Sequence, residues 1–340
     1  MPALPTPRGS LSEAVLDALR RAPGSLPASA VAVPAPADPL ADDDLHLALY
    51  ACYELHYRGL DGVDERWEWD PGLLALRAEL EAIFEAGVRA ALAGWSPPEA
   101  DAATMDLALR AIADADEAPS LSCHLERHGT LKQFTELVVH RSAYQLKEAD
   151  PHSWAIPRLW GGPKAALIEV QTDEYGGGDP QRMHARLFAD TMEELGLDPS
   201  YGAYMDVLPG VTLATVNLMS LLGLHRRHRG AIVGHLALFE MTSSIPNRRY
   251  ATALRRLGVR ARRATEFYDE HVTADAIHEN IAAVDLAGGL VRQEPALVGD
   301  VLFGARALVE LEGRWATALM DAWKAGGSAL RSPLGEAVAA

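Results

Sequence analysis

His271, Asp275 and His278 lie within eight positions near the C-terminal end of the sequence, at a spacing that a helix would place on one face. Because a helix advances about 100° per residue, offsets of four and seven residues leave the three side chains within roughly 60° of one another. Two imidazoles and a carboxylate on one stripe could ligate a metal ion, or they could form an ordinary solvated face. Polar residues flank the segment, so the segment alone favours the solvated face.

Carboxylates elsewhere in the chain favour a metal site. Glu240 follows a run of Leu, Ala and Phe in GHLALFEMTSS, and a carboxylate on a buried helix is costly unless it has a partner. Glu174 ends a predicted helix just before GGGDP, and His184 lies one turn into the next predicted helix. The glycines between them can act as a hinge that brings both side chains toward one point. Glu148 ends the helix that contains YQLKEAD.

These candidate ligands are carboxylates and imidazoles, without a thiolate. Such a set suits iron or manganese, and carboxylates that bridge two metal ions inside a helical bundle are a known arrangement. Zinc remains possible on ligand type, although the absence of an HExxH pattern argues against a zinc hydrolase. Cys52 and Cys123 lie far apart and outside any Cys-x-x-Cys pattern, which excludes a cysteine-rich site. The full set is Glu148, Glu174, His184, Glu240, His271, Asp275 and His278.

The elements that must position this set are predicted to be helices throughout. Proline, glycine and cap-type residues punctuate the helical segments, and no alternating strand pattern is present. A helix over 231–242 is expected to end near Pro246, where a second helix over 246–257 begins. The predicted class is therefore all-α. Four parts are expected: an extended arm over 1–38, a helical subdomain over 39–118, a bundle over 119–327 and a loose tail over 328–340.

Composition indicates a folded, acidic protein. The chain has 340 residues, 49% of them hydrophobic, and a formal net charge of −16. Such a charge argues against a nucleic-acid partner, which requires concentrated Lys and Arg. The start, MPALPTPRGS, lacks the apolar core of a signal peptide, and no apolar run approaches the roughly 20 residues of a membrane span. We therefore expect a cytoplasmic protein without a membrane partner.

The order and spacing of the candidate ligands resemble the heme-oxygenase-like diiron oxidases and oxygenases, a family of iron-containing redox enzymes. The specific part is the HxxxDxxH of 271–278, about thirty residues after Glu240. The segments HRSAYQLKEADPHSWAIPRLWG and EYGGGDPQRMH also look like members of that family. The similarity covers roughly residues 120 to 325. It implies a seven-helix, heme-oxygenase-like bundle that binds two irons rather than heme, with the additional N-terminal helical subdomain outside it.

The resemblance also implies roles for individual residues. One iron would be held by Glu148, His184 and His278, and the other by Glu240, His271 and Asp275. Glu174 matches an additional carboxylate of members that oxygenate amine nitrogens. Glu136 and His140, on the first helix of the bundle, remain alternatives to Glu148. Candidates to orient the histidines are Asp206, Tyr268 and Asp269.

The function expected from this resemblance is oxidation of a small organic substrate with O2 as co-substrate, and N-oxygenation of an amine is the favoured reaction. Oxidative C–C cleavage with decarboxylation, or desaturation of a fatty or amino acid, is the main alternative. Two alternative functions belong to other classes of protein: a non-catalytic helical binding or assembly module, and a heme-degrading enzyme. No flavin or pyridine-nucleotide motif is present, so an external electron donor is expected. The tryptophans Trp67, Trp69 and Trp95 favour a homodimer.

Overall fold

The structure, a computed structural model, describes residues 1–26, 33 and 36–334, without the side chains of residues 274–277. Within this part of the chain every regular element is a helix. No helix among the described residues is long and apolar enough to cross a membrane. The α-helices are α1 Ser10–Leu19, α2 Asp43–Glu54, α3 Pro71–Ala91, α4 Met105–Asp114, α5 Leu121–Arg127, α6 Leu131–Gln145, α7 Asp150–Ser153, α8 Gly161–Glu174, α9 His184–Glu194, α10 Gly210–Leu224, α11 Arg229–Arg256, α12 Arg262–Asn280, α13 Gly289–Gln293 and α14 Val298–Lys324. Short 3-10 turns separate several of them, and a π-helical segment, Ile281–Gly288, continues α12 into α13.

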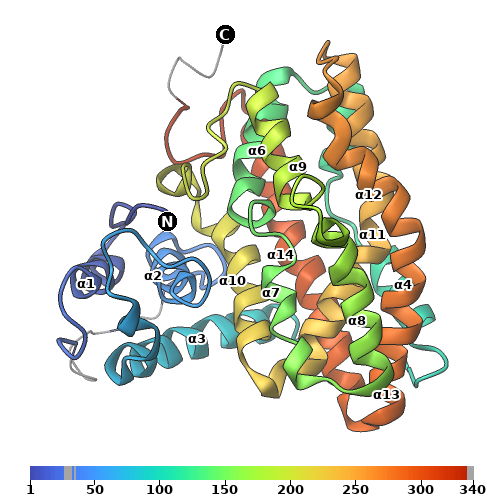
Figure 1. The fold of residues 1–340 in the computed structure, drawn as a ribbon, viewed down its shortest axis with the longest axis horizontal. Coiled ribbons are helices and arrows are strands. Elements are labelled where there is room, and N and C mark those ends of the chain that lie inside the picture. The colour runs from blue at the N-terminus through green and yellow to red at the C-terminus, as the bar shows by residue number, and fades with distance from the viewer. Residues whose placement is uncertain (27–32, 34–35, 335–340) are drawn as a thin grey trace.

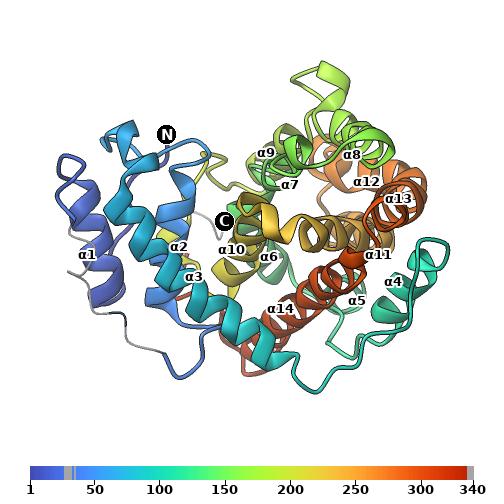
Figure 2. The same cartoon turned by 90° about the horizontal axis from the view of Figure 1, so that it is seen from below.

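Helices α1, α2 and α3 form a layer beside the bundle (Figures 1 and 2). Two aspartates set where these helices begin: Asp42 accepts the backbone N–H of Leu45 at the start of α2, and Asp70 does the same for Leu73 at the start of α3. Helix α2 lies between α1 and α10, so it joins the layer to the bundle. The expected extended arm therefore contains a helix, α1, whose apolar face is buried.

Helices α11 and α14 run parallel and pack in close contact inside the bundle. A Cβ atom on Gly234 would lie 1.8 Å from the carbonyl oxygen of Val301, and one on Gly304 would lie 1.8 Å from that of Ala231. Only glycine permits so close an approach of two backbones. Helix α12 packs against α11 and α9, which places three site-bearing helices side by side (Figure 1).

The expected break at Pro246 is wrong, because α11 runs unbroken from Arg229 to Arg256 with the proline inside it. Proline removes one helical hydrogen bond and usually costs about 3 kcal/mol in a helix interior. Here both halves of the helix bury apolar residues in the same core, Leu236 and Leu238 before the proline and Leu254 after it. Burial of about 1.5–3 kcal/mol per large apolar side chain outweighs the local penalty.

Helix α6 ends at Gln145, three residues before Glu148, at which the sequence predicted its end, and the turn that follows departs from helical geometry. Ala149 has φ +73°, which a non-glycine residue rarely adopts and which costs about 1–3 kcal/mol. Its carbonyl oxygen accepts the Nε2–H of Gln171 on α8 at 2.9 Å and the backbone N–H of Ser153 at 3.0 Å. These bonds hold the strained turn in place, and Glu148 is the residue just before it.

Candidate metal centre

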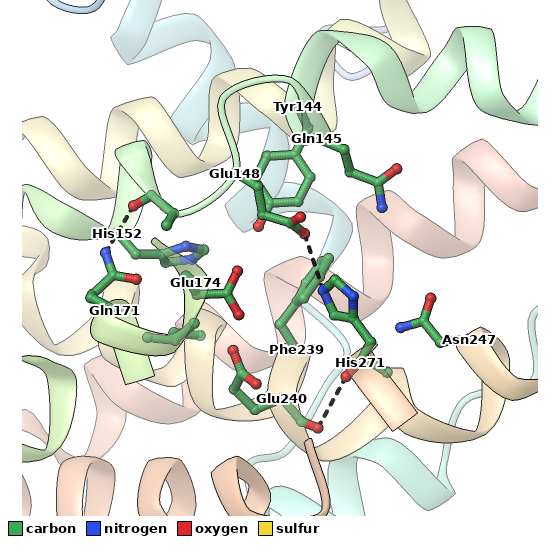
Figure 3. A pocket seen from close by; sticks show the side chains of 13 residues that line it. Tyr144, Gln145, Glu148, His152, Gln171, Glu174, Phe239, Glu240, Asn247 and His271 are labelled. Atoms are coloured by element: carbon green, nitrogen blue, oxygen red, sulfur yellow. Dashed lines mark hydrogen bonds and ion pairs between the residues drawn. The ribbon is translucent and has the colours of Figure 1, made fainter. Parts of the chain in front are cut away.

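Six of the seven candidate ligands come together in the interior of the bundle. Their ligand atoms form two groups, and within each group the atoms lie within 4.8 Å of one another. The first group is Glu148, Glu174, His184 and His271, and the second is Glu174, Glu240 and His278. Glu174 belongs to both groups. Every member is buried, and Figure 3 shows four of them around one cavity.

Five segments supply these side chains. Glu148 lies in the turn after α6, Glu174 is the last residue of α8, and His184 is the first residue of α9. Glu240 lies in the middle of α11, and α12 carries both remaining histidines. The sequence therefore places each ligand either at a helix end or on a helix face that points into the core.

A glycine turn brings the end of α8 and the start of α9 together. Gly176 has φ +68°, and a Cβ atom there would lie 2.6 Å from the backbone of both Arg182 and Met183. The chain therefore folds back tightly only because this residue is glycine. As a result, His184 Nδ1 lies 2.9 Å from Glu174 Oε2.

Each histidine of α12 has one ring nitrogen held by a neighbour and the other directed at a carboxylate. His271 Nδ1 is 2.7 Å from the carbonyl oxygen of Phe267, and its Nε2 is 3.7 Å from Glu148 Oε1 (Figure 3). His278 Nε2 is 2.9 Å from Asp173 Oδ2, and its Nδ1 is 3.4 Å from Glu240 Oε2. A ring nitrogen fixed in this way sets the tautomer and orientation of the imidazole, as in protein metal sites.

The site contains buried polar side-chain atoms that lack hydrogen bonds. Within the described part of the chain, four such atoms are Glu148 Oε2, Glu174 Oε2, His184 Nδ1 and His278 Nδ1. The short contact between His184 and Glu174 does not have hydrogen-bond geometry. Each unsatisfied buried polar atom costs about 1–3 kcal/mol. A cation bound among them would satisfy all four, so the residues fit a metal centre.

The electrostatics of the site are those of carboxylates and imidazoles held close together. Burial raises the pKa of Glu174, but the imidazoles of His184, His271 and His278 lower it further, and the net pKa lies well below its usual range. Burial lowers the pKa of His278, but the carboxylates of Glu240 and Asp173 outweigh it and raise the pKa to about 9. The imidazoles must lose these protons when a metal binds, because only a neutral ring nitrogen can be a ligand.

The structure groups the ligands differently from the arrangement that the resemblance implied. His271 lies with Glu148 and His184, whereas His278 lies with Glu240. The two histidines are seven residues apart, about 10 Å along α12. The order of the residues in the sequence does not show which end of the helix lies beside the α6 turn and which beside α11. The side chain of Asp275, between them, lies outside the described residues.

Two alternatives to Glu148 have other partners. Glu136 Oε1 accepts the backbone N–H of Ala329 at 2.6 Å, and His140 Nδ1 is 2.6 Å from the hydroxyl oxygen of Thr212. Neither residue belongs to the two groups of close ligand atoms found among the described residues. Glu148 is therefore the member of this region that faces the other candidate ligands.

Two of the three residues proposed from sequence to orient the histidines have other partners. Asp206 bonds to the backbone N–H and hydroxyl of Thr6, and Asp269 bonds to Arg255. The acid that contacts His278 is instead Asp173, next to Glu174. Asp173 and Glu174 form an acidic pair at the end of a predicted helix, and this pair was the sequence signal that could have identified Asp173.

Residues 135–313, more than half of the chain, match the family described as iron-containing redox enzymes. The match includes all six described ligand residues. No curated protein matches the chain. The chain thus belongs to the all-α, heme-oxygenase-like family of iron-containing redox enzymes.

Proposed function

We propose that this protein is a non-heme diiron enzyme that uses O2 to oxidise a small organic substrate, and that its reaction is N-oxygenation of an amine. The observation that carries the proposal is the position of Glu174, which belongs to both groups of ligand atoms. A carboxylate shared in this way is what a pair of metal ions needs as a bridge. The family supports iron as the metal.

The residues divide naturally between two ions. Glu148, His184 and His271 would hold one iron, Glu240 and His278 the other, and Glu174 would contact both. Asp275 is the expected further ligand, because its place on α12 lies between the two histidines. Two ferrous ions held there would supply the electrons and the binding site with which O2 is reduced.

The remaining residues of the site shape the space beside the ligands. Tyr144, Leu236 and Phe239 contribute apolar surface to a cavity of about 30 Å³, which admits a water or two. A nearly dry cavity strengthens the interactions of the charged ligands and keeps bulk water away from the reacting groups. His271 and His278 keep their orientation through Phe267 and Asp173.

N-oxygenation requires an external electron donor. The overall reaction joins R–NH2, O2, two electrons and two protons to give R–NHOH and water, so an N–O bond forms and the second oxygen atom leaves as water. The substrate itself supplies none of these electrons. We therefore include a separate reductant, a small molecule or a partner protein, in the proposal.

The test is turnover by protein loaded anaerobically with Fe(II), given a reductant and ¹⁸O2. Primary amines, amino acids and fatty acids would be offered, and the products analysed by mass spectrometry. The proposal predicts one ¹⁸O atom on the nitrogen of an amine. It also predicts loss of this product in Glu240→Ala and its retention in Glu169→Ala, a change at an exposed glutamate of α8.

Other products would contradict the proposed reaction in distinct ways. Loss of CO2 or of two hydrogens from a fatty or amino acid, without labelled nitrogen, would assign the alternative reaction to the same site. Absence of any iron-dependent product would instead favour a non-catalytic binding or assembly module.

A further inference from the structure

A second cavity, of about 280 Å³, adjoins the metal centre. It lies between the α4–α5 connection and helices α6, α11 and α14. Four residues line both this cavity and the small one at the metal centre: Gln145, Phe239, Ser243 and Asn247. Figure 3 shows Gln145 and Asn247 beside His271, on the side away from Glu174. The larger cavity is therefore a chamber next to the ligands, of a size that suits a small organic molecule.

An ion pair lines this chamber. Arg141 on α6 donates from Nη1 to Glu312 Oε1 at 2.9 Å and from Nη2 to Oε2 at 2.6 Å. Its guanidinium lies 3.9 Å from the centre of the Trp315 ring, which also lines the chamber. The two charged side chains keep 20% and 23% of their surface exposed. Because Arg141 is fixed on two sides, it offers a rigid cation beside a rigid anion.

Both charged groups retain hydrogen-bonding capacity. A guanidinium has five N–H donors, and the pair uses two of them. A carboxylate has about four lone-pair positions, and Arg141 occupies two. A ligand that carries a carboxylate and an ammonium group could therefore bind to both without breaking the pair. A ligand with an apolar head would instead bury the charges without replacing their water, at a cost.

The path from this ion pair to the metal centre starts along one face of α6. Arg141 and Gln145 are one helical turn apart on that face, and Glu148 lies in the turn that follows Gln145, the last residue of the helix. Midway, Gln145 Oε1 is buried and has no hydrogen-bond partner among the described residues. The apolar side chains of Leu238 and Phe239 line the same stretch. This arrangement suits a short aliphatic chain with a donor group.

We propose that this chamber binds the head of an amino-acid-like substrate, with its carboxylate on Arg141 and its α-ammonium on Glu312. The aliphatic part then passes Leu238 and Phe239, and a second, terminal nitrogen reaches the metal centre past Gln145. The inference rests on the proposed function for the fate of that nitrogen, and it names the substrate class of the same site. Arg141 and Glu312 are specificity-determining residues that do not touch the metal.

The test measures binding by calorimetry to the anaerobic Fe(II) protein, without turnover. The probes are L-ornithine, L-lysine and L-arginine, each compared with its decarboxylated counterpart, putrescine, cadaverine or agmatine. At least one amino acid is expected to bind about tenfold or more tightly than its counterpart, because a charge-assisted contact to the carboxylate is lost in the amine. In Arg141→Met this preference should disappear.

Two further variants keep the test sharp. Arg306→Met removes a comparably buried arginine of α14 that pairs with Glu310 outside the chamber, and it should leave the preference unchanged. If Arg141→Met does not fold, the double variant Arg141→Met/Glu312→Met removes both charges together and avoids a lone buried carboxylate. Each variant is checked for helical content by circular dichroism and for iron per chain.

The proposal is overturned if no probe binds, if every amine binds as well as its amino acid, or if the preference survives loss of Arg141. Failure of the proposed function gives a different pattern. Selective binding that depends on Arg141, without any oxidised product after O2 and reductant are added, would keep the chamber and reject the reaction.

Discussion

Replacement of Lys147 by methionine tests how strongly a buried ion pair joins the N-terminal layer to the bundle. Lys147 Nζ lies 2.9 Å from Glu54 Oε2, and the two side chains are 1% and 0% exposed. The ammonium also lies 4.1 Å from the centre of the Tyr57 ring. The same Glu54 oxygen accepts a hydrogen bond from Tyr201 at 2.7 Å. This buried pair joins α2 to the turn in which Glu148 follows Lys147 directly.

The expected cost follows from the partner that is left behind. In Lys147→Met, Glu54 keeps only the Tyr201 hydroxyl on one oxygen, and its Oε1 has no hydrogen bond within the described residues. Breaking a buried ion pair in this way typically costs about 3–5 kcal/mol. The double variant Lys147→Met/Glu54→Gln removes both charges, so most of the loss should be recovered, with a coupling energy of about 2 kcal/mol or more.

The assay is urea denaturation of the metal-free protein, followed by far-ultraviolet circular dichroism. The wild type, both single variants and the double variant form a thermodynamic cycle. Lys324→Met, at an exposed lysine near the end of α14, is the control and should change stability by less than about 0.5 kcal/mol. Two results would contradict a strong buried ion pair. One is a loss of less than about 1 kcal/mol in the free energy of unfolding of Lys147→Met; the other is a double variant whose loss equals the sum of the two single losses.

Three further changes test other parts of the structure. Gly304→Ala should lower the free energy of unfolding in urea by about 1–3 kcal/mol, because the added Cβ would overlap the carbonyl oxygen of Ala231. Gly299→Ala, where a Cβ would meet open space, should not lower it. Equal effects of the two changes would contradict the close packing of α11 and α14. Burial lowers the pKa of His46 to about 4, so between pH 4 and 6.5 this histidine is neutral in the folded protein and protonated in the unfolded chain. The free energy of unfolding should therefore fall by roughly 3 kcal/mol as the pH drops from above 6.5 to about 4. In urea titrations, His46→Gln should reduce this dependence of stability on pH. Asp173→Asn should weaken iron binding by about 10- to 100-fold in Fe(II) titrations, because Asp173 holds His278, and unchanged affinity would show that this contact does not support a ligand.

The helical stripe and the buried glutamate were readable in the sequence. His271 and His278 have the spacing of one helix face, and Glu240 lies in an apolar run, so local sequence patterns were enough to predict these three as candidate ligands. The glycines before His184 likewise indicated a hinge. These signals depend only on neighbours in the chain, and the family resemblance then brought the separate segments together.

Contacts between distant segments could not be predicted in the same way. The sequence does not show which end of α12 faces Glu148, so the structure groups the histidines differently from the arrangement that the resemblance implied. Arg141 and Glu312 are 171 positions apart and meet only because α6 and α14 pack in the bundle. Continuation of α11 through Pro246 depends on core burial on both sides of the proline, which outweighs the local preference to end a helix.

The number of irons bound per chain tests most directly whether these residues form a paired metal site. Metal-free protein would be titrated anaerobically with Fe(II), and bound iron counted by metal analysis and Mössbauer spectroscopy. Two irons per chain are expected in the wild type and in the exposed control Glu169→Gln on α8. The paired site should be lost in Glu174→Gln, because that carboxylate belongs to both groups of ligand atoms. A wild-type protein with at most one iron, or a Glu174→Gln variant that holds both irons unchanged, would contradict a paired metal site.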